Sequence, residues 1–421
     1  MMSRLARWSI ALPLLAACRG GDSADTASMP YAREVAEAVP KIESATGLTF
    51  RTPPKVESRS REQVREFLLQ RFHEDLPDEE LQSMQRTYAR FGLLGDSVQL
   101  GPLLLDLLSE QVAGYYDPAA KTLYIVEGSA PELIGITVAH ELVHALQDQY
   151  VNLDSIQHLD GDNDRLVASQ AVMEGQATYV QMQTMLGAGA VDNLPGGWDR
   201  VRDLIRESQG SMPVFAAAPM ILQETLLFPY LSGAEFMRRY AERAPDGSLY
   251  DALPQSTEQI LHEDAYFGTP DAPTRVSLPA PSAGSVRYEN NLGEFETRLL
   301  LYQLLQDQNA AFRGAAGWDG DRYALLELPG GGEALVWVTI WDSAIDAGEF
   351  HDLFDTALSR RYRDLRPGVS TSAVRRYEAD GRSLELHTLT IDGRPSVFYV
   401  DMPAGTATAP MDPAAITVAQ P

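Results

Sequence analysis

The chain contains 421 residues, with 34 Lys and Arg against 59 Asp and Glu, so its formal net charge at pH 7 is −25. Such an acidic surface argues against nucleic acid as a partner. A hydrophobic content of 44% suits a globular protein, and a chain of this length predicts two or three domains. No run after the N-terminus is long and apolar enough to predict a transmembrane helix.

The N-terminus has the pattern of an export signal. Two arginines precede the apolar run 8–17, which is too short to span a bilayer, and a Leu-Ala-Ala-Cys string ends at Cys18. This string resembles the lipobox at which bacterial lipoproteins are cleaved and acylated, and Cys18 is the only cysteine in the chain. The sequence therefore predicts a signal peptide over 1–17, an exported protein anchored to a membrane through lipid on Cys18, and a flexible tether over 18–30.

The next two segments are predicted to be a helical layer that walls a cleft and a β-hairpin. Apolar residues recur at helical spacing within 31–108, which predicts an N-terminal helical layer. Two short β-prone runs, 110–116 and 122–126, are separated by a turn that contains Pro118. Because proline pre-sets the backbone for a turn, these runs predict a β-hairpin.

Helical patterns then dominate as far as residue 267 and give way to alternating strands. Helices are predicted at 131–150, 164–186, 198–208, 220–243 and 257–266. A proline-rich tract without periodicity predicts a linker over 268–290. Beyond it, helices are predicted at 292–306 and 345–361, and strands at 323–328, 333–341, 383–391 and 395–401. The predicted fold class is α+β: a mainly helical catalytic domain over 109–267 with a small hairpin, and an α+β module over 291–421.

A metal-binding pattern lies inside the helix predicted at 131–150. The string His140-Glu141-Leu142-Val143-His144 places two imidazoles on one helical face, one turn apart, where both can reach one tetrahedral zinc ion. Glu141 can address the fourth coordination position, where a metal-bound water would sit. Most other positions of this helix are apolar, and burying these three side chains would be costly without a shared partner. The sequence therefore predicts a zinc site.

A third protein ligand is needed, and the downstream candidates are Asp148, Asp154, His158 and Glu174. A metzincin would need Gly at position 147 and His at 150, so Gln147 and Tyr150 exclude that class. Asp154 and His158 remain open. We prefer Glu174 because it lies mid-helix beside Gly175 and Ala177, small residues that would let this helix approach the motif helix closely.

The motif and its downstream helix resemble the gluzincins. The strings H-E-L-V-H-A-L-Q-D-Q at 140–149 and M-E-G-Q-A-T at 173–178 are similar to those of a group of largely uncharacterised exported prokaryotic proteins, and the resemblance extends over most of 114–350. It implies a zincin-like catalytic domain, zinc at His140, His144 and Glu174, and hydrolysis of peptide or protein substrates. There is no N-E-x-x-S-D around Glu174 and no G-x-M-E-N before the motif, so exopeptidase specificity is not implied.

The expected mechanism needs further groups around the zinc. Zinc would lower the pKa of its bound water towards about 7, and Glu141 would take the proton and pass it to the leaving amine. The developing oxyanion needs a second donor, which could be Tyr230 at a helix break or His262 at a helix end. If they are not donors, Tyr230 would be an aromatic residue of the core, and His262 would be a histidine at a helix C-terminus, where the helix dipole favours it. Asp148 could orient a zinc ligand through a hydrogen bond, or be an exposed carboxylate.

Two other segments, and two other function classes, stay open. Peptide could add as a strand along the Tyr115/Tyr116 hairpin, although packing tyrosines are the alternative. The W-D-G-D string at 318–321 weakly resembles a calcium loop, and we expect a turn there. The rival functions are a catalytically silent binding lipoprotein with a zinc fold and a zinc hydrolase of non-peptide amides in the cell envelope. Glu141 argues against the silent protein, because a structural zinc site needs no base.

Overall fold

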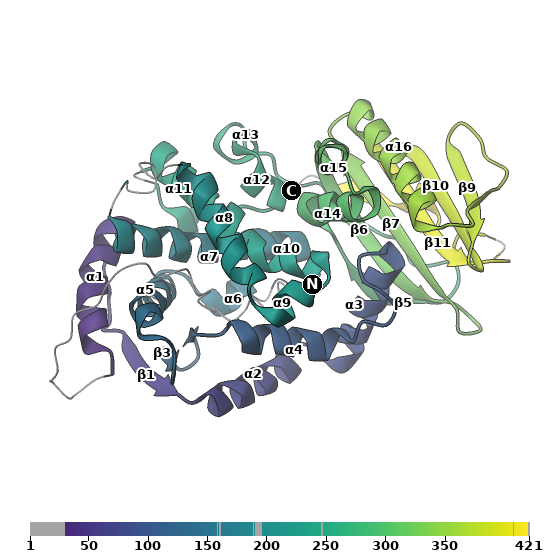
Figure 1. Cartoon of the computed structure of the whole chain (residues 1–421). Helices are drawn as coiled ribbons and strands as arrows, with labels where there is room; N and C mark the ends of the chain where they lie inside the picture. Colours follow the sequence, from purple (N-terminus) through teal and green to yellow (C-terminus); the bar gives the residue numbers. More distant parts are fainter. Residues whose placement is uncertain are drawn as a thin grey trace.

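The computed structural model of the chain describes residues 30–157, 159, 161–187, 189, 196–245, 247–406 and 408–419. The predicted signal peptide, the lipidation site Cys18 and the candidate ligand His158 lie outside the described residues. The fold class is α+β, as predicted, with a helical N-terminal part and a C-terminal module built on a sheet (Figure 1). No helix among the described residues combines the length and the apolar character that crossing a bilayer requires.

The segment after residue 31 is mainly helical, as predicted. Its helices are α1 (Ala32–Thr46), α2 (Arg61–Asp75), α3 (Asp78–Phe91) and α4 (Leu100–Gln111). Strand β1 (Lys55–Arg59) was not predicted, and it lies parallel to β3 in a three-stranded sheet of order β1-β3-β2. Helix α2 begins at a capping box. The Ser60 side chain accepts a hydrogen bond from the Gln63 backbone N–H, and the Gln63 side chain accepts one from the Ser60 backbone N–H.

The predicted hairpin consists of β2 (Gly114–Asp117) and β3 (Thr122–Val126), which pair antiparallel. The prediction that the first strand starts at residue 110 was wrong, because α4 continues to Gln111. The Glu110 carboxylate accepts from the backbone N–H groups of Val214 and Phe215, at 2.9 Å each, and so ties the end of α4 to α9 (Pro213–Ala217).

The hairpin is followed by a run of helices, of which α5 (Pro131–Gln147) and α7 (Asn163–Leu186) carry the motif residues. The run also includes α6 (Leu153–Gln157), α8 (Gly197–Gly210), α10 (Met220–Phe228), α11 (Ala234–Arg243), α12 (Thr257–Leu261) and α13 (Glu263–Phe267), with a 3-10 turn at Leu249–Asp251. The helix predicted at 220–243 contains a π-helical segment, η2 (Pro229–Gly233), because Pro229 has no N–H to continue the α-helical pattern. The helix predicted at 257–266 is divided at His262.

The C-terminal module is a seven-stranded sheet with helices on one face. The strand order is β5-β6-β7-β11-β10-β9-β8, and all pairs are antiparallel. The strands are β5 (Ser285–Asn290), β6 (Trp318–Glu327), β7 (Glu333–Trp341), β8 (Arg366–Pro367), β9 (Val374–Ala379), β10 (Arg382–Ile391) and β11 (Arg394–Pro403). Helices α14 (Gly293–Leu305), α15 (Gln308–Ala315) and α16 (Ala344–Arg361) cover one face (Figure 1).

The remaining short elements close the other face of this sheet. Strands β4 (Arg275–Ser277) and β12 (Thr417–Ala419) pair with each other, and a 3-10 turn at Pro413–Ala415 precedes β12. Strands β4 and β5 fall within the tract expected as a linker. The expected turn at 318–321 was wrong, because these residues begin β6, with a bulge between Trp318 and Gly320.

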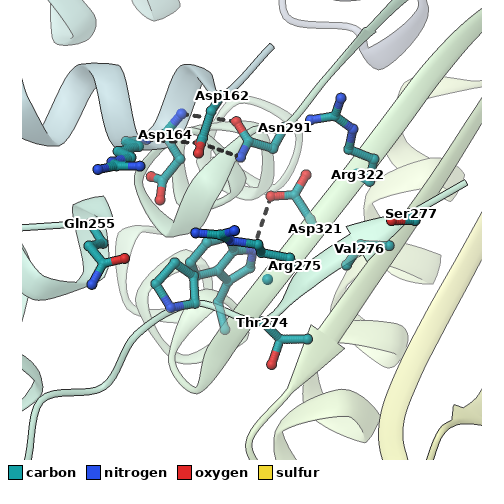
Figure 2. A pocket seen from close by; sticks show the side chains of 14 residues that line it. Asp162, Asp164, Gln255, Thr274, Arg275, Val276, Ser277, Asn291, Asp321 and Arg322 are labelled. Carbon is teal, nitrogen blue, oxygen red and sulfur yellow. Dashed lines mark hydrogen bonds between the residues drawn. The ribbon is translucent and has the colours of Figure 1, made fainter. Parts of the chain in front are cut away.

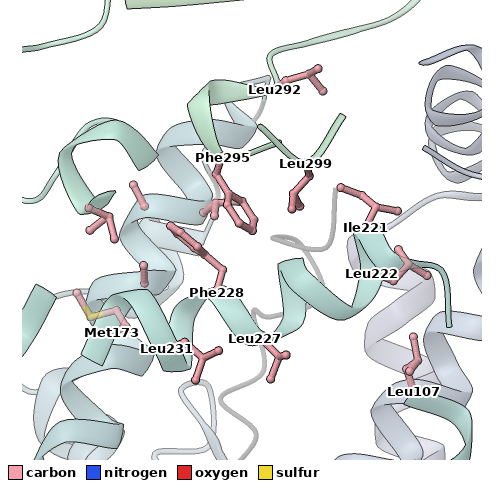
Figure 3. Close-up of a cluster of buried hydrophobic side chains, with 14 of the residues drawn as sticks. Leu107, Met173, Ile221, Leu222, Leu227, Phe228, Leu231, Leu292, Phe295 and Leu299 are labelled. Atoms are coloured by element: carbon pink, nitrogen blue, oxygen red, sulfur yellow. The ribbon is translucent and has the colours of Figure 1, made fainter. Parts of the chain in front are cut away.

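One hydrophobic core runs through both parts of the molecule. Phe228 of α10 stacks on Phe295 of α14 with ring centroids 4.0 Å apart, and Figure 3 shows the two rings facing each other among leucines of both helices. Phe91 of α3 likewise packs edge-on against Trp337 of β7, at 5.2 Å. The sheet is therefore packed against the helical part by aromatic contacts, which bury large apolar surfaces.

Candidate metal centre

Three polar side chains meet in the apolar interior between α5 and α7. Helix α5 has Pro131 at its first position, where the missing N–H costs nothing, and is buried from Ile136 to Gln147. This buried stretch contains His140 and His144, whose side chains are 2% and 0% exposed. Glu174 lies in the middle of α7 and is equally inaccessible. The structure thus brings together the three residues that were predicted as ligands.

The spacing of the three ligand atoms suits a tetrahedral metal ion. His140 Nε2 lies 3.1 Å from Glu174 Oε2 and 3.2 Å from His144 Nε2, and His144 Nε2 lies 3.5 Å from the same Glu174 oxygen. Metal–ligand bonds of about 2.0–2.1 Å at tetrahedral angles would separate neighbouring ligand atoms by about 3.3–3.4 Å. His140, His144 and Glu174 could therefore hold one metal ion.

Two glutamines fix the imidazoles with these nitrogens turned inward. His144 Nδ1 donates to Gln147 Oε1 at 2.8 Å, and His140 Nδ1 donates to Gln181 Oε1 at 3.2 Å. With both Nδ1 hydrogens engaged, the Nε2 lone pairs face each other and the Glu174 carboxylate. Acceptor atoms at this distance need a proton or a cation between them, and this fits a metal site.

A hydrogen-bond chain holds Gln147 in place. Its Nε2 donates to Met173 O and to Gln176 Oε1, both at 2.9 Å, and the Tyr250 hydroxyl donates to the same Gln176 oxygen at 2.7 Å. From the sequence, Gln147 served only to exclude the metzincins, and Gln181 was not identified. Gln181 lies two helical turns after Glu174, on the same face of α7, and this spacing is a signal that could have identified it.

The electrostatics of the metal-free triad favour one internal ion pair. Burial alone would raise the pKa of Glu174, but the His144 and His140 imidazoles lower it to about 2. Burial lowers the pKa of His140. Burial would also lower the pKa of His144, but the Glu174 and Glu141 carboxylates raise it to about 9. Without metal, Glu174 is thus ionised and His140 neutral, which are the forms that bind metal, whereas His144 carries a proton that a bound metal ion would displace.

Glu141 and Tyr230 lie beside the triad. Glu141 is fully buried, and its charge acts on both His144 and the Tyr230 phenol. The Tyr230 ring stacks against the His140 ring at 6.2 Å between centroids, and its hydroxyl donates to the Glu174 carboxylate. Burial, Glu174 and Glu141 raise the pKa of Tyr230, so the phenol keeps its proton. It therefore has a hydrogen to donate.

A close backbone contact brings Tyr230 to this position. Tyr230 belongs to the π-helical segment η2, which packs on α7. Gly175 was expected to let α7 approach the motif helix, but it faces Gly233 of η2 instead. Consecutive positions of a helix point about 100° apart, so Glu174 and Gly175 meet different neighbours. The absence of a side chain at Gly175 therefore lets η2, which carries Tyr230, pack close to the triad.

His262 and Asp148 lie apart from the triad. His262 Nε2 bonds with Glu294 Oε1 at 2.8 Å, and this side chain is 34% exposed. The Asp148 carboxylate accepts from Tyr116 OH at 2.7 Å and from Lys121 Nζ at 2.6 Å, and the hydrogen bonds to the imidazoles come from the two glutamines instead. Asp154 lies in α6, and its side chain is outside the described part of the structure.

The hairpin tyrosines are packing residues. Tyr115 is 1% exposed and stacks on Phe67 at 4.7 Å, and its hydroxyl accepts from Arg59. Tyr116 is also buried and donates to Asp148. Strand β2 nevertheless lies at an edge of the three-stranded sheet, next to β3. Addition of a peptide strand at that edge stays a prediction.

A separate cavity of about 420 Å³ lies where the start of α7 meets β4 and β6, and its lining includes none of the triad (Figure 2). Asp321 on its wall accepts from Trp337 Nε1 at 2.8 Å and Trp318 Nε1 at 3.2 Å, and from the backbone of Leu292 and Gly293. Burial raises the pKa of Asp321 to about 6 in spite of these bonds. The side chain thus organises the junction between α14 and the sheet.

Known proteins resemble parts of this chain. Residues 283–402 match a domain of unknown function, DUF8575. No curated protein matches the chain. A crystal structure from Chloroflexus aurantiacus, described provisionally as a hydrolase with a novel fold, is 20% identical, covers 56% of this chain and 87% of its own, and superposes with a TM-score of 0.33. A similarity at this TM-score establishes neither a shared fold nor a shared activity.

Proposed function

We propose that this protein is a zinc-dependent hydrolase that cleaves peptide bonds. The arrangement of His140, His144 and Glu174 supports the proposal most strongly, because their ligand atoms lie 3.1–3.5 Å apart and all three side chains are buried. Two imidazoles and one carboxylate are a donor set typical of catalytic zinc sites. A zinc ion held there would supply a Lewis acid that polarises a carbonyl group and makes water more acidic.

The groups beside the triad support hydrolysis rather than a structural metal site. Glu141 follows a proposed ligand directly, and its charge acts on His144 and Tyr230. A carboxylate in this place can take a proton from the attacking water and return it to the leaving amine. The Tyr230 hydroxyl can donate to the oxygen of the attacked carbonyl when it leaves Glu174. His262, which bonds with Glu294, has no part in this proposal.

The peptide specificity rests on the resemblance to gluzincins in the sequence around His140 and Glu174. A mixed peptide library incubated with the purified, zinc-loaded protein tests it. We expect internal cleavage by the wild type, loss of cleavage in Glu141→Gln with zinc retained, and normal cleavage in Glu132→Gln, which changes an exposed carboxylate at the start of the same helix. Equal cleavage by wild type and Glu141→Gln would defeat the proposal, and so would stoichiometric zinc with no cleavage by either.

Export and membrane anchoring are a further part of the proposal. They rest on the short apolar run before Cys18 and on the absence of any other cysteine from the sequence. Expression in a bacterial host should place the wild type in the membrane fraction and release it only with detergent. Cys18→Ala should abolish the lipid, which mass spectrometry of the N-terminal peptide detects. A soluble, unacylated wild-type protein would contradict the anchor.

A further inference from the structure

A second group of acidic side chains lies between the helical part and the C-terminal module. Glu258 belongs to α12, Asp271 to the loop before β4, and Asp342 follows the end of β7. Each offers a carboxylate oxygen, and these oxygens lie within 4.8 Å of one another. Two carboxylates from neighbouring segments and one from the end of β7 thus converge on one point. The metal centre described above does not involve them.

The Glu258 carboxylate has no compensating partner. Glu258 is only 6% exposed, and among the described residues its side chain has neither a hydrogen-bond donor nor a basic group beside it. Placing a charged carboxylate in a protein interior is costly unless it is paired or coordinates a metal. Burial, followed by the charges of Glu294, Asp271, Asp342 and Asp164, raises the pKa of Glu258 to about 10. The four charges are all negative and oppose ionisation of Glu258, and a cation bound among the three carboxylates would offset them.

The backbone around the three carboxylates is firmly held. Asp342 N donates to Gly317 O at 2.9 Å, next to the pairing of Trp318 with Trp341. The backbone N–H of Asp271 donates to Ala265 O at 2.9 Å, and the backbone carbonyl of Asp271 accepts from Gln259 Nε2. The convergence is therefore part of the fold.

The W-D-G-D string supports this site without supplying a ligand. Asp319 accepts from Thr274 Oγ1 at 2.8 Å and pairs with Arg394, while Asp321 is bonded to two tryptophans. Both carboxylates are thus already engaged. Their role is to fix the start of β6, which in turn positions Asp342.

We propose that Glu258, Asp271 and Asp342 bind a calcium ion that joins α12 to the end of β7. Calcium takes six to eight oxygen ligands at about 2.3–2.6 Å, so one ion can bridge oxygens up to about 5 Å apart. Asp271 and Asp342 are exposed, so water can complete the coordination shell. Zinc favours nitrogen and sulfur ligands, which this group lacks. The ion adds a structural site that is independent of the proposed hydrolase centre.

Calcium titration of the zinc-loaded wild-type protein tests the proposal. We expect one calcium ion per chain by isothermal titration calorimetry and a melting temperature that rises to saturation with calcium. Magnesium at equal concentration should give a smaller rise. An equal response to magnesium would overturn the assignment to calcium. No binding at 10 mM calcium, about ten times the dissociation constant of the weakest extracellular sites, would overturn the site.

Variants locate the site and separate it from the metal centre. Glu258→Gln and Asp342→Asn should each weaken calcium binding at least tenfold, whereas Asp264→Asn, at an exposed carboxylate on neighbouring α13, should not. Asp342 is exposed, so its variant should fold even if the Glu258 variant does not. His140→Ala should lose zinc and keep the calcium response. Unchanged calcium affinity in Asp342→Asn, or loss of the calcium response in His140→Ala, would contradict the proposal.

Discussion

Gly175 of α7 and Gly233 of η2 meet backbone to backbone: a Cβ atom on Gly175 would lie 2.2 Å from the Gly233 carbonyl carbon. This contact sets the position of Tyr230 above the triad. Neither backbone can yield without moving a whole helix, so the pair of glycines is a structural requirement of the site.

Gly175→Ala should destabilise the fold and impair the site together. Overpacking in a dense interior costs about 1–3 kcal/mol, and the displaced segment carries Tyr230. Chemical denaturation should therefore show a lower free energy of unfolding and the peptide assay a lower rate. Gly135→Ala, in α5 with open space around its Cβ position, should be neutral or gain up to about 1 kcal/mol. Equal stability of Gly175→Ala and wild type would show that the contact is not tight.

Gln147→Leu and Gln181→Leu should weaken zinc binding. Each removes the oxygen that orients one imidazole, and such losses typically cost about 10–100-fold in metal affinity. Competition with a chromophoric chelator measures the dissociation constant. Gln183→Leu, on the same helix as Gln181 and partly exposed, serves as the control. If both variants bind zinc as tightly as the control does, the glutamines do not support the ligands.

Tyr230→Phe should lower kcat by about 10²–10³-fold with little change in KM, since a hydrogen bond that forms to the reacting oxygen acts on the transition state. Zinc content must be measured in parallel, because the phenol also bonds with Glu174. Tyr302→Phe, at a partly exposed position on α14, should retain full activity. An unchanged kcat would show that Tyr230 is a packing residue and does not stabilise the oxyanion.

His262 should make the stability pH-dependent. Its hydrogen bond with Glu294 raises the pKa of His262 in the folded protein, against the opposing effect of burial. Because the pKa of His262 is higher in the folded than in the unfolded protein, its interaction with Glu294 stabilises the fold fully below the unfolded-state pKa of about 6.5. This stabilisation is lost as the pH rises through the folded-state pKa. The difference in free energy of unfolding between wild type and His262→Asn should therefore be larger at pH 5.5 than at pH 9. A difference that does not vary with pH would contradict this.

The sequence predicted the features that depend on local spacing. The four-residue interval between His140 and His144 and the mid-helix place of Glu174 follow from helical periodicity, and the helices α5 and α7 confirm those predictions. The expected roles of Asp148 and His262 rested on chain position alone. In the structure their side chains bond with Tyr116 and Glu294 instead, partners that helical spacing cannot reveal.

Features that depend on contacts between distant segments were not predicted. Strand β5 lies in a proline-rich tract and is stabilised by pairing with β6. The W-D-G-D string has the composition of a turn, yet pairing with the end of β7 makes it a bulged strand. The contact of Gly175 with Gly233 requires a π-helical segment whose place next to α7 no local pattern specifies.

The proposed hydrolase activity depends on one zinc ion held by His140, His144 and Glu174. Elemental analysis by mass spectrometry of the purified wild type, His140→Ala and Glu174→Gln tests it most directly. We expect one zinc per chain in the wild type and little or none in either variant, with all three proteins folded by circular dichroism. A wild type that binds no zinc when zinc is supplied, or a folded Glu174→Gln variant that keeps one zinc per chain with unchanged affinity, would contradict it.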